Sequence, residues 1–428
     1  MFKPFALLAR RRFAPLFWVQ FLIALNDNIY KNALIILITY HSISAWGFKP
    51  AQLTNLAAGL FILPFFLFSA SCGFIADRFE KTQLIRGIKL AEIMIMLLAC
   101  LAFYLNSMPL LMGVLFLLGL QATFFGPLKY SILPQHLAEQ ELLQGNGLIE
   151  MGTFIAILLG TLLGSSVVNL PKIGLYIING LLLGSALLGF LLSLFIPKAP
   201  ANDSQLRLSL NIFAHIGLTL KIARQNSKVF GAILAISWFW LYGALFLTQL
   251  PSYVKNSLGG NEYVFSLFLA LFSLGIALGS TLCAKLSDKT IDFSLVAFGS
   301  IGMSLFSIGM YFCTPRAVDI IPLTLGQFIY QSHALGIIIC LLGLSVFSGF
   351  FTVPLYALIQ HLGEPKSRSR IIAANNIMNA LFMVLAALGG IIFLSFKFSV
   401  AQLFLLIGLG NGLVALYYYN YAAKQVAA

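Results

Sequence analysis

Long apolar runs, broken by short segments with Gly, Pro, Asn or charged residues, follow one another along the whole chain. A helix needs about 20 apolar residues to cross a bilayer, and these runs reach helical length. Such runs favour helices over the alternating segments of about ten residues that build membrane β-barrels. Hydropathy and turn signals predict twelve spans, at 14–41, 53–76, 83–105, 109–133, 146–168, 173–196, 229–251, 262–285, 293–313, 334–359, 372–394 and 400–422.

The segment 197–228 separates the sixth predicted span from the seventh, and 314–333 is predicted to be an external loop. In the first of these, apolar side chains recur at near-helical spacing among basic ones: Leu206, Leu210, Phe213 and Leu220, with Arg207, Lys221, Arg224 and Lys228. This pattern predicts an amphipathic helix on the inner membrane surface. We therefore expect an N-terminal six-helix bundle at 1–196, a cytoplasmic linker at 197–228 and a C-terminal six-helix bundle at 229–428.

Motifs of the first half recur in the second half, which supports this division. The related stretches are 119–127 with 349–354, 135–137 with 360–362, 145–147 with 374–376, and 76–78 with 287–289. Two six-helix halves that are parallel repeats resemble the organisation of the major facilitator superfamily, an all-α membrane fold.

Composition places the chain in the membrane. Only 9% of its 428 residues are charged and 60% are hydrophobic, whereas soluble domains carry about 25% charged residues. The net charge of +13 would favour nucleic-acid binding in a soluble protein. Here about 18 of the basic residues fall on one side of the membrane, about 5 on the other, and three lie within spans: Lys31, Lys89 and Lys129. This positive-inside asymmetry places both termini in the cytoplasm and explains the charge without a nucleic-acid partner.

The chain lacks the signatures of enzymes and of metal or disulfide sites. Its cysteines lie in or beside apolar spans without a CxxC pair, so they are expected to be buried apolar residues: Cys72, Cys100, Cys283, Cys313 and Cys340. GxSxG, P-loop and HExxH motifs are absent. His136 and Glu141 form an HxxxxE pattern, one residue type short of an acyltransferase box. We expect no catalytic residue, metal or cofactor, and no ATP-driven pumping.

The polar stretch 26–32 interrupts the first span. Counting from Ala14 places Asp27 roughly 20 Å along the helix, near or just past the bilayer midplane. An ionisable group at that depth is normally turned inward and is paired or functional. Asp27 and Lys31 lie four residues apart, on one helical face, so they form either a buried ion pair or a polar floor for a ligand. We predict the second role for both, together with Asn28.

The stretch 73–81 resembles the signature GxxxD[RK]xG[RK] that joins spans two and three in the superfamily, with Glu80 in place of a glycine. Gly73 permits close helix approach, and Asp77 can face the positive N-terminal end of a helix in the other half. A contact that breaks and re-forms there would act as a gate. We predict a gating role for Gly73, Asp77 and Arg78; an ordinary cytoplasmic turn is the alternative.

Further charged residues lie in spans three to five. Lys129 and Glu150 are about equally far from the loop that joins spans four and five, so they form an ion pair or line the cytoplasmic mouth of a path. Lys89 and Glu92, three residues apart on span three, are expected to be structural. Gln121 lies in the repeated stretch of span four. Lys129, Glu150 and Gln121 are counted with the predicted substrate-binding residues.

The second half is aromatic where the first half is charged. Spans seven and ten carry Trp238, Trp240, Tyr242 and Gln249, and Phe347, Phe350, Phe351 and Tyr356. Asn375 and Asn379 form an i, i+4 stripe on span eleven. Aromatic spans are often packing alone, but the contrast between the halves suggests an amphiphilic substrate, with its headgroup at Asp27 and its acyl chain along the aromatic side. We predict that Trp240, Tyr242, Asn375 and Asn379 contact it.

Three long stretches, 20–28, 125–134 and 145–160, resemble the bacterial lysophospholipid transporter family of the major facilitator superfamily, and most of all the transporter half of fused transporter–acyltransferase proteins. The resemblance implies a secondary transporter that flips lysophospholipids such as lysophosphatidylethanolamine from the outer to the inner leaflet of the bacterial inner membrane by alternating access. Re-acylation would follow. The resemblance also implies substrate-binding roles for Asp27, Lys129 and Glu150, because the motifs that contain them match the family. Span seven, however, lacks a basic residue that stand-alone relatives carry.

The resemblance also implies partners. Because the chain ends at Ala428, the acyltransferase or acyl-ACP synthetase is expected to be a separate protein, and the transporter a monomer surrounded by membrane lipids. A rival hypothesis is a proton-coupled exporter of drugs, siderophores or other small amphiphiles, in which Asp27 titrates. A membrane enzyme is the third class, and the missing motifs disfavour it.

Overall fold

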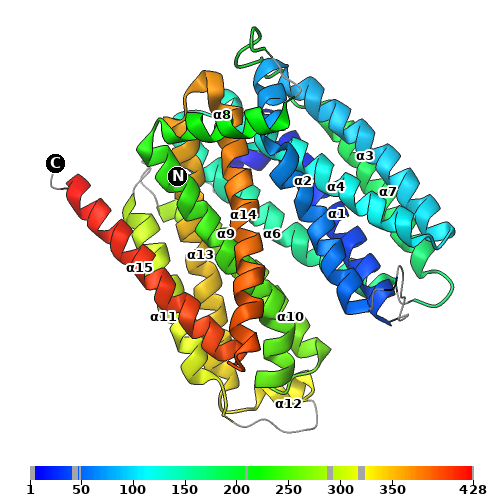
Figure 1. Cartoon of the computed structure of the whole chain (residues 1–428), viewed down its shortest axis with the longest axis vertical. Helices are drawn as coiled ribbons and strands as arrows, with labels where there is room; N and C mark the ends of the chain where they lie inside the picture. The colour runs from blue at the N-terminus through cyan, green and yellow to red at the C-terminus, as the bar shows by residue number, and fades with distance from the viewer. Residues whose placement is uncertain are drawn as a thin grey trace.

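The computed structural model describes residues 5–40, 47, 50–168, 170–207, 211–286, 293–316 and 323–426. This part of the chain forms twelve helices of 20 to 29 residues (Figure 1). The first six are α1 (Ala14–Tyr40), α2 (Pro50–Arg78), α3 (Lys81–Tyr104), α4 (Met108–Ser131), α6 (Leu142–Val167) and α7 (Gly174–Ser193). The second six are α9 (Ser227–Ser252), α10 (Glu262–Leu286), α11 (Phe293–Cys313), α13 (Ala334–Leu362), α14 (Arg368–Ser395) and α15 (Val400–Val426).

Shorter helices lie between the long ones: η1 (Ala6–Ala9), α5 (Leu133–His136), η2 (Glu139–Glu141), α8 (Ile212–Arg224), η3 (Tyr253–Ser257), α12 (Leu325–Ile329) and η4 (Pro365–Ser367). The predicted external loop at 314–333 therefore contains a helix, α12, although residues 317–322 lie outside the described residues. The predicted repeat partner at 287–289 also lies outside them.

The twelve long helices follow the order of the twelve predicted spans. Eleven helices in the described ranges are long and apolar enough to cross a membrane; α3, which carries Lys89 and Glu92, is not among them. Within the first half, α1 packs on α6 and α7, α2 on α4, and α3 on α4 and α7. Within the second half, α11 packs on α13 and α15, α10 on α13, and α14 on α9. The predicted all-α fold of two six-helix bundles is confirmed.

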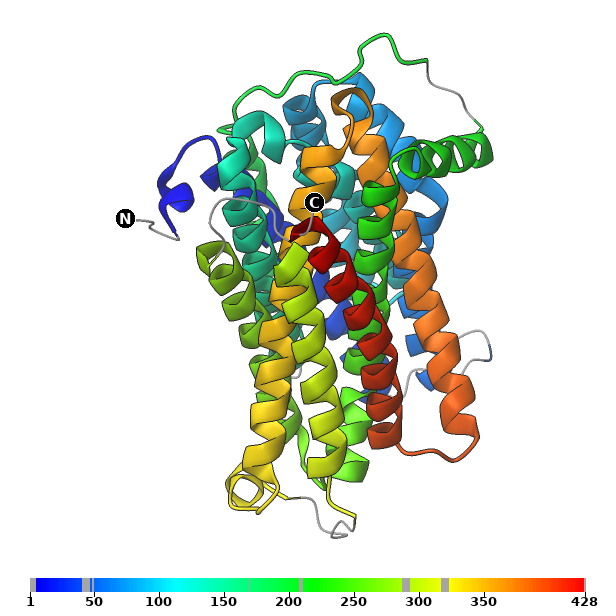
Figure 2. The same cartoon turned by 90° about the vertical axis from the view of Figure 1, so that its left-hand side faces the viewer.

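One end of the molecule collects the start of α1, the end of α15, α8 and most of the basic loops, and we call it the basic end (Figures 1 and 2). The segments there carry Arg10, Arg11, Arg12, Arg78, Lys81, Arg86, Lys198, Arg207, Lys221, Arg224, Lys228, Lys366, Arg368 and Arg370. The described segments at the opposite end carry Lys172, Lys255, Arg316 and Lys397. The charge asymmetry expected from the sequence thus coincides with the two ends of the helix bundle.

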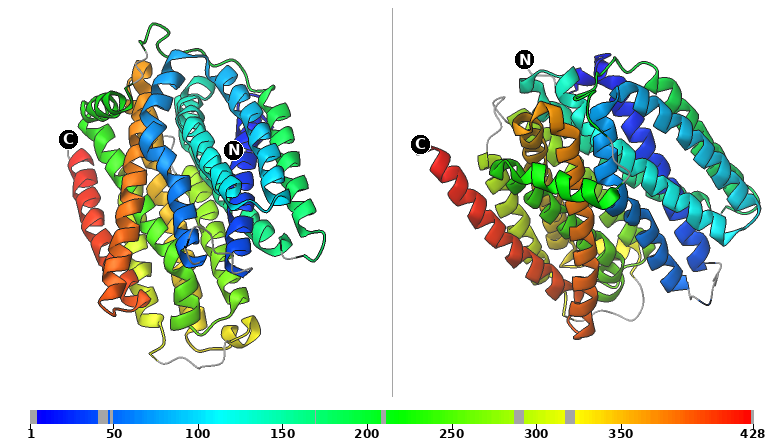
Figure 3. Two further views of the ribbon diagram at one scale, coloured as in Figure 1. Left: turned by 45° about the vertical axis from the view of Figure 1, so that its right-hand side comes forward. Right: turned by 45° about the horizontal axis from the view of Figure 1, so that its top comes forward.

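The two bundles meet at the basic end. Across the interface α2 packs on α14 and α6 on α10. The larger hydrophobic core joins residues of both halves, whereas a second core, from Ile29 to Ala186, contains residues of the first half alone. The ribbons of α2 and α14 lie close together at the basic end and diverge toward the opposite end (Figures 1 and 3). The bundles are therefore in contact at the basic end, and the ribbons of α2 and α14 move apart beyond it.

The chain after α7 is hydrogen-bonded to the turn between α2 and α3. The Thr82 hydroxyl donates to the Pro197 carbonyl at 2.7 Å, and the Lys81 ammonium donates to the Pro200 carbonyl at 3.1 Å and to Asn202 Oδ1 at 2.9 Å. The amphipathic helix predicted between the bundles follows as α8, which includes Phe213 and Leu220 but begins after Leu206; Leu210 lies outside the described residues. The linker is thus held against the first bundle before it reaches the second.

Glu80, which departs from the superfamily signature, has a local structural role. It caps the N-terminus of α3, because its carboxylate accepts hydrogen bonds from the backbone N–H groups of Thr82 and Gln83, and it also accepts one from Ala199. Partial burial raises the pKa of Glu80, but these hydrogen bonds outweigh burial and leave the pKa below its ordinary value.

We expect Glu80→Ala to lower the free energy of unfolding by about 1 kcal/mol at pH 7. Since the folded-state pKa is depressed, this contribution is present above the unfolded pKa of about 4.3 and is lost as the pH falls through the folded value. The measurement is thermal unfolding in detergent at several pH values. Glu139→Ala, which removes an exposed carboxylate paired with His361, is the control, because surface pairs contribute little. Equal effects of the two variants at neutral pH would contradict the capping role.

Candidate functional site

The polar stretch of α1 is held inside the first bundle by close packing against α6. A Cβ atom on Gly160 would lie 2.7 Å from Asn28 Cβ, and one on Gly164 would lie 2.5 Å from the Ile29 carbonyl oxygen. Asp27 is 8% exposed and Asn28 7%. The aspartate therefore lies inside the protein, as an ionisable group at this depth requires.

A buried network fixes the neighbouring Asn26. Its amide donates to Glu92 Oε1 at 2.9 Å, and Glu92 Oε2 accepts from Lys89 at 2.5 Å and from Gln121 at 2.7 Å. Lys89 and Glu92 are fully buried, so their ion pair neutralises two charges within the bundle. The network joins α1, α3 and α4, and it gives Lys89 and Glu92 the structural contacts expected from their spacing. Gln121 belongs to this network through its amide nitrogen.

Asp27 and Lys31 do not neutralise each other directly. Within the described residues they form no ion pair, and Asp27 Oδ1 is buried without a hydrogen-bond partner. The Lys31 ammonium lies 5.8 Å from the centre of the Phe61 ring on α2, a cation–π distance. Glu92, Lys31 and Lys89 are the charged groups that act on Asp27. Among the described residues, this carboxylate and this ammonium on α1 thus lack a direct ionic partner.

Lys129 and Glu150 also lack the direct ion pair that was one of their expected arrangements. Instead the Tyr130 hydroxyl donates to Glu150 Oε1 at 2.5 Å, and the Lys129 ammonium lies 4.7 Å from the centre of the Tyr130 ring. Glu150 is 2% exposed. Among the described residues, the tyrosine thus separates the two charges.

Tyr130 connects this cluster to the second bundle. Its ring stacks on Tyr356 of α13, with centroids 4.4 Å apart and planes 7° apart, and Trp240 Nε1 donates to the Tyr356 hydroxyl at 3.2 Å. Neither Tyr130 nor Tyr356 was among the predicted site residues. Tyr130 directly follows Lys129 in a stretch that resembles the lysophospholipid transporters, and this neighbourhood is the signal that would have found it.

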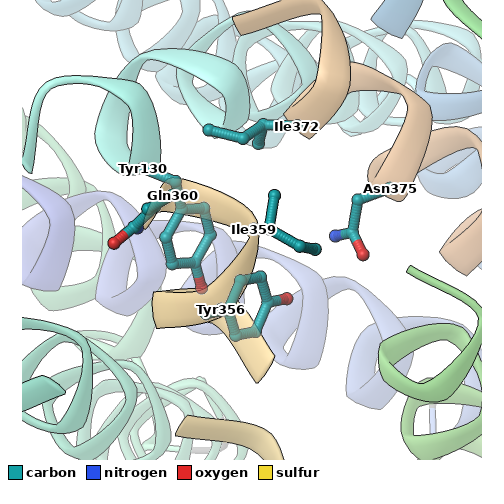
Figure 4. A pocket seen from close by; sticks show the side chains of 6 residues that line it. All are labelled: Tyr130, Tyr356, Ile359, Gln360, Ile372 and Asn375. Atoms are coloured by element: carbon teal, nitrogen blue, oxygen red, sulfur yellow. The ribbon is translucent and has the colours of Figure 1, made fainter. Parts of the chain in front are cut away.

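A small pocket lies at this junction between the bundles (Figure 4). Its lining residues are Tyr130, Tyr356, Ile359, Gln360, Ile372 and Asn375. The space among these side chains leaves no room even for a water molecule, so this junction is closed to a lipid. Asn375 is fully buried, with the Tyr356 hydroxyl nearby and no hydrogen-bond partner for either amide atom within ordinary distance.

Two predicted residues of the second half lie apart from this junction. Tyr242 is 1% exposed and has Ser307 of α11 as a polar neighbour, so it points into its own bundle. Asn379 accepts a hydrogen bond from Ser237 of α9 at 2.9 Å. Trp240 and Asn375 thus lie at the junction with the first bundle, next to Tyr356, whereas Tyr242 and Asn379 lie within the second bundle.

The predicted gate lies at the basic end and crosses the two bundles. Asp77 is fully buried at the N-terminus of α14, where its carboxylate accepts from the backbone N–H groups of Ser369 at 3.0 Å and Arg370 at 3.2 Å. The Arg370 side chain donates to it at 2.9 Å, and Asn202 of the linker donates to it at 2.7 Å. A buried carboxylate at a helix N-terminus is favoured by the helix dipole and by these charge-assisted bonds.

Other gate residues differ from the sequence-based expectation. The Arg78 guanidinium lies over the ring of its neighbour Phe79, 5.4 Å from the centroid, whereas Arg370 makes the ionic contact with Asp77. Asn146 and Gln360 exchange two amide hydrogen bonds across the interface, at 2.6 and 3.0 Å. Arg370 and Asn202 were missed because nothing in the spacing along the chain links them to Asp77.

Two bundles that close at one end, with buried charged groups between them, define a membrane transporter. The family model of the Major Facilitator Superfamily matches residues 16–387, so the chain belongs to this superfamily. The chain is 27% identical over 372 residues to the lysophospholipid transporter LplT of Klebsiella pneumoniae (strain 342), covering 86% of this chain and 84% of that protein. It is also 27% identical over 363 residues to LplT of Yersinia pestis (strain Pestoides F), covering 83% and 80%. The resemblance drawn from the sequence is confirmed.

Solved structures share the fold. The transporter FucP in the outward conformation superimposes with a TM-score of 0.72 at 12% identity, over 96% of this chain and 99% of that one. A bacterial homologue of the iron transporter ferroportin, in the outward-facing state, gives a TM-score of 0.71 at 14% identity, over 97% and 100%.

Close packing at Gly73 yields a prediction for the gate. A Cβ there would lie 2.7 Å from Ala373 Cβ and 3.0 Å from Arg370 Cα, so Gly73→Ala should weaken closure of the basic end. Overpacking costs typically 1–3 kcal/mol, which corresponds to roughly 5- to 150-fold more opening. A cysteine replacing Ile372, which is buried in the junction pocket, reports opening by its rate of maleimide labelling once the native cysteines are replaced.

Gly59→Ala is the matched control, because Gly59 lies on the same helix and a Cβ there meets nothing within 4 Å. Labelling rates that are equal in the Gly73→Ala and Gly59→Ala proteins would show that closure does not depend on this contact.

Proposed function

We propose that this protein is a flippase that moves lysophospholipids, such as lysophosphatidylethanolamine, from the outer to the inner leaflet of the bacterial inner membrane by alternating access. The observation that carries the proposal is the similarity to lysophospholipid transporters over more than four-fifths of this chain. The charges of α1 add chemical support, because the substrate carries both a phosphate and an ammonium group. By the positive-inside rule the basic end faces the cytoplasm.

The headgroup would bind where Asp27 and Lys31 lie one helical turn apart. Side chains at this spacing have Cβ atoms about 5–6 Å apart, a separation that suits an ammonium and a phosphate joined by two carbons. Asp27 would accept from the ammonium, and Lys31 would pair with the phosphate. Asn28 would assist them. In this role the unpartnered Asp27 oxygen gains a donor only when substrate is bound.

The acyl chain would lie along apolar surface beyond the closed end. Leu63 and Phe66 of α2 are each 42% exposed, and Leu385 and Leu388 of α14 are 48% and 53% exposed. A lipid in transit can keep its chain against such surface while its headgroup enters the protein. Trp240 lies deeper, beside Tyr356, where the second bundle would receive the headgroup after the gate opens.

The cycle would exchange closure at one end for closure at the other. In this proposal the end that faces the cytoplasm is closed by Asp77, the Asn146–Gln360 pair and the Tyr130–Tyr356 stack, which join the two bundles. Opening that end requires all three contacts to break. Lys129 and Glu150 would then line the exit, and Gln121 would stay in the network beneath the binding residues. Re-acylation by a separate acyltransferase or acyl-ACP synthetase would consume the product, and the transporter would act as a monomer without a cofactor.

We expect Asp27→Asn with Lys31→Ala to reduce flux of labelled lysophosphatidylethanolamine by roughly 10- to 100-fold, since hydrogen bonds to charged groups contribute about 1.5–3 kcal/mol. Label is supplied in the outer leaflet, and the re-acylated product is measured. Glu262→Gln, at the opposite end of the molecule, is the control for a loss of charge. Normal flux in the double variant would remove the central role of this pair. Efflux that requires a proton gradient, without lipid flux, would instead favour the exporter of small amphiphiles.

A further inference from the structure

α8 carries a surface that the transport cycle does not use. It lies across the spans at the basic end (Figures 1 and 2). His215, Thr219 and Ala223 form its buried face, which packs on α2 and α14. On the other side Phe213 is 78% exposed and Leu218 45% exposed.

Basic residues follow these apolar ones on the same exposed side. Lys221 and Arg224 are exposed in the last turn of α8, and Lys228 is exposed just after it. No acidic residue occurs between Asp203 and Glu262 in the sequence, so nothing nearby in the chain neutralises them. An apolar and basic helix face parallel to a membrane surface fits a leaflet that contains anionic headgroups.

We propose that α8 binds anionic phospholipid at the basic end, and that this binding stabilises the closed form of the gate. Phe213 and Leu218 would enter the headgroup boundary, while Lys221 and Arg224 would pair with lipid phosphates. Each basic residue near an anionic membrane surface strengthens binding about fivefold.

The buried face of α8 connects this surface to the gate. The His215 ring stacks on Phe74 of α2, with centroids 4.2 Å apart and planes 17° apart, and its Nδ1 lies 3.0 Å from the Ser71 hydroxyl. The Arg370 guanidinium lies 5.2 Å from the centre of the same Phe74 ring and also bonds Asp77. Burial lowers the pKa of His215, which disfavours a positive charge on the stacked ring.

The direction of the effect follows from the helices that α8 touches. It packs on α2 of the first bundle and on α14 of the second. It can keep both contacts only while these helices lie together at the basic end. A ligand favours the state that it binds better, so lipid that holds α8 in place favours closure there.

The test measures conformation in the full-length protein and therefore does not depend on the transported substrate. Spin labels at Gly59→Cys and Gly389→Cys report the separation of α2 and α14 at the opposite end, where a side chain at either site meets nothing within 4 Å. The native cysteines are replaced in this protein. Nanodiscs contain phosphatidylcholine alone or with increasing phosphatidylglycerol. We expect phosphatidylglycerol to increase the population with the long distance.

Lys221→Gln with Arg224→Gln should abolish most of this response. We expect the ratio of the long-distance to the short-distance population in phosphatidylglycerol to fall by on the order of fivefold for each charge removed. Arg10→Gln with Arg11→Gln is the matched control, since it removes two exposed charges at the same end. His215→Ala should also remove the response, and His215→Phe, which preserves an aromatic stack on Phe74, should retain part of it.

Three results would overturn the proposal. One is a long-distance population that does not change with phosphatidylglycerol, a result that would favour a protein partner for this face of α8. Another is an unchanged response in the Lys221 and Arg224 double variant. The third is an equal loss in the Arg10 and Arg11 control, which would indicate general surface charge.

Discussion

The described arrangement of this transporter depends on one buried carboxylate. Asp77 has no exposed surface, and its two oxygens accept from the first turn of α14, from the Arg370 side chain and from Asn202. A charge in such a place is tolerated only when its hydrogen bonds are satisfied, and removing its partners leaves an unpaired buried charge. The contact is therefore either fully made or fully broken, which suits a gate between two rigid bundles.

The contacts around the gate do not follow the internal repeat. Asn146 bonds Gln360 across the interface, but their repeat-related residues, Asn375 and Gln135, make different contacts. Gln135 donates to Pro200 and Asn202 of the linker, and Asn375 lies buried at the junction pocket. The linker thus contributes to closure on one side of the pseudo-symmetric interface. Asn202 is central to this, because it contacts Lys81, Gln135 and Asp77 at once.

Sequence reasoning succeeded where the deciding interactions are local. Apolar runs define the helices, the i, i+3 spacing of Lys89 and Glu92 corresponds to a buried ion pair, and the stretch around Asp77 places a carboxylate at the end of α2. Its partner Arg370 lies 293 residues away, and no local pattern specifies which helix N-terminus meets Asp77.

The same limit applies to two pairs of charges whose spacing allowed an ion pair as one of two arrangements. Correct helical spacing did not bring Asp27 and Lys31 together, because Lys31 turns toward Phe61 of α2. Likewise the hydroxyl of Tyr130, the residue after Lys129, contacts Glu150, in place of the Lys129–Glu150 ion pair that was one of the two open arrangements. The partner that each of these side chains contacts depends on how the helices pack, and spacing along the sequence does not specify that packing.

The most direct test of this account is the distance between spin labels at Gly59→Cys and Gly389→Cys when Asp77 is replaced by Asn. These sites lie 18 residues before Asp77 in α2 and 19 residues after Arg370 in α14, roughly 27 Å from the gate at 1.5 Å per residue. If the Asp77 carboxylate holds the basic end closed, Asp77→Asn shifts the population from the long distance to a short one. An unchanged distance distribution in a folded Asp77→Asn protein would contradict the account.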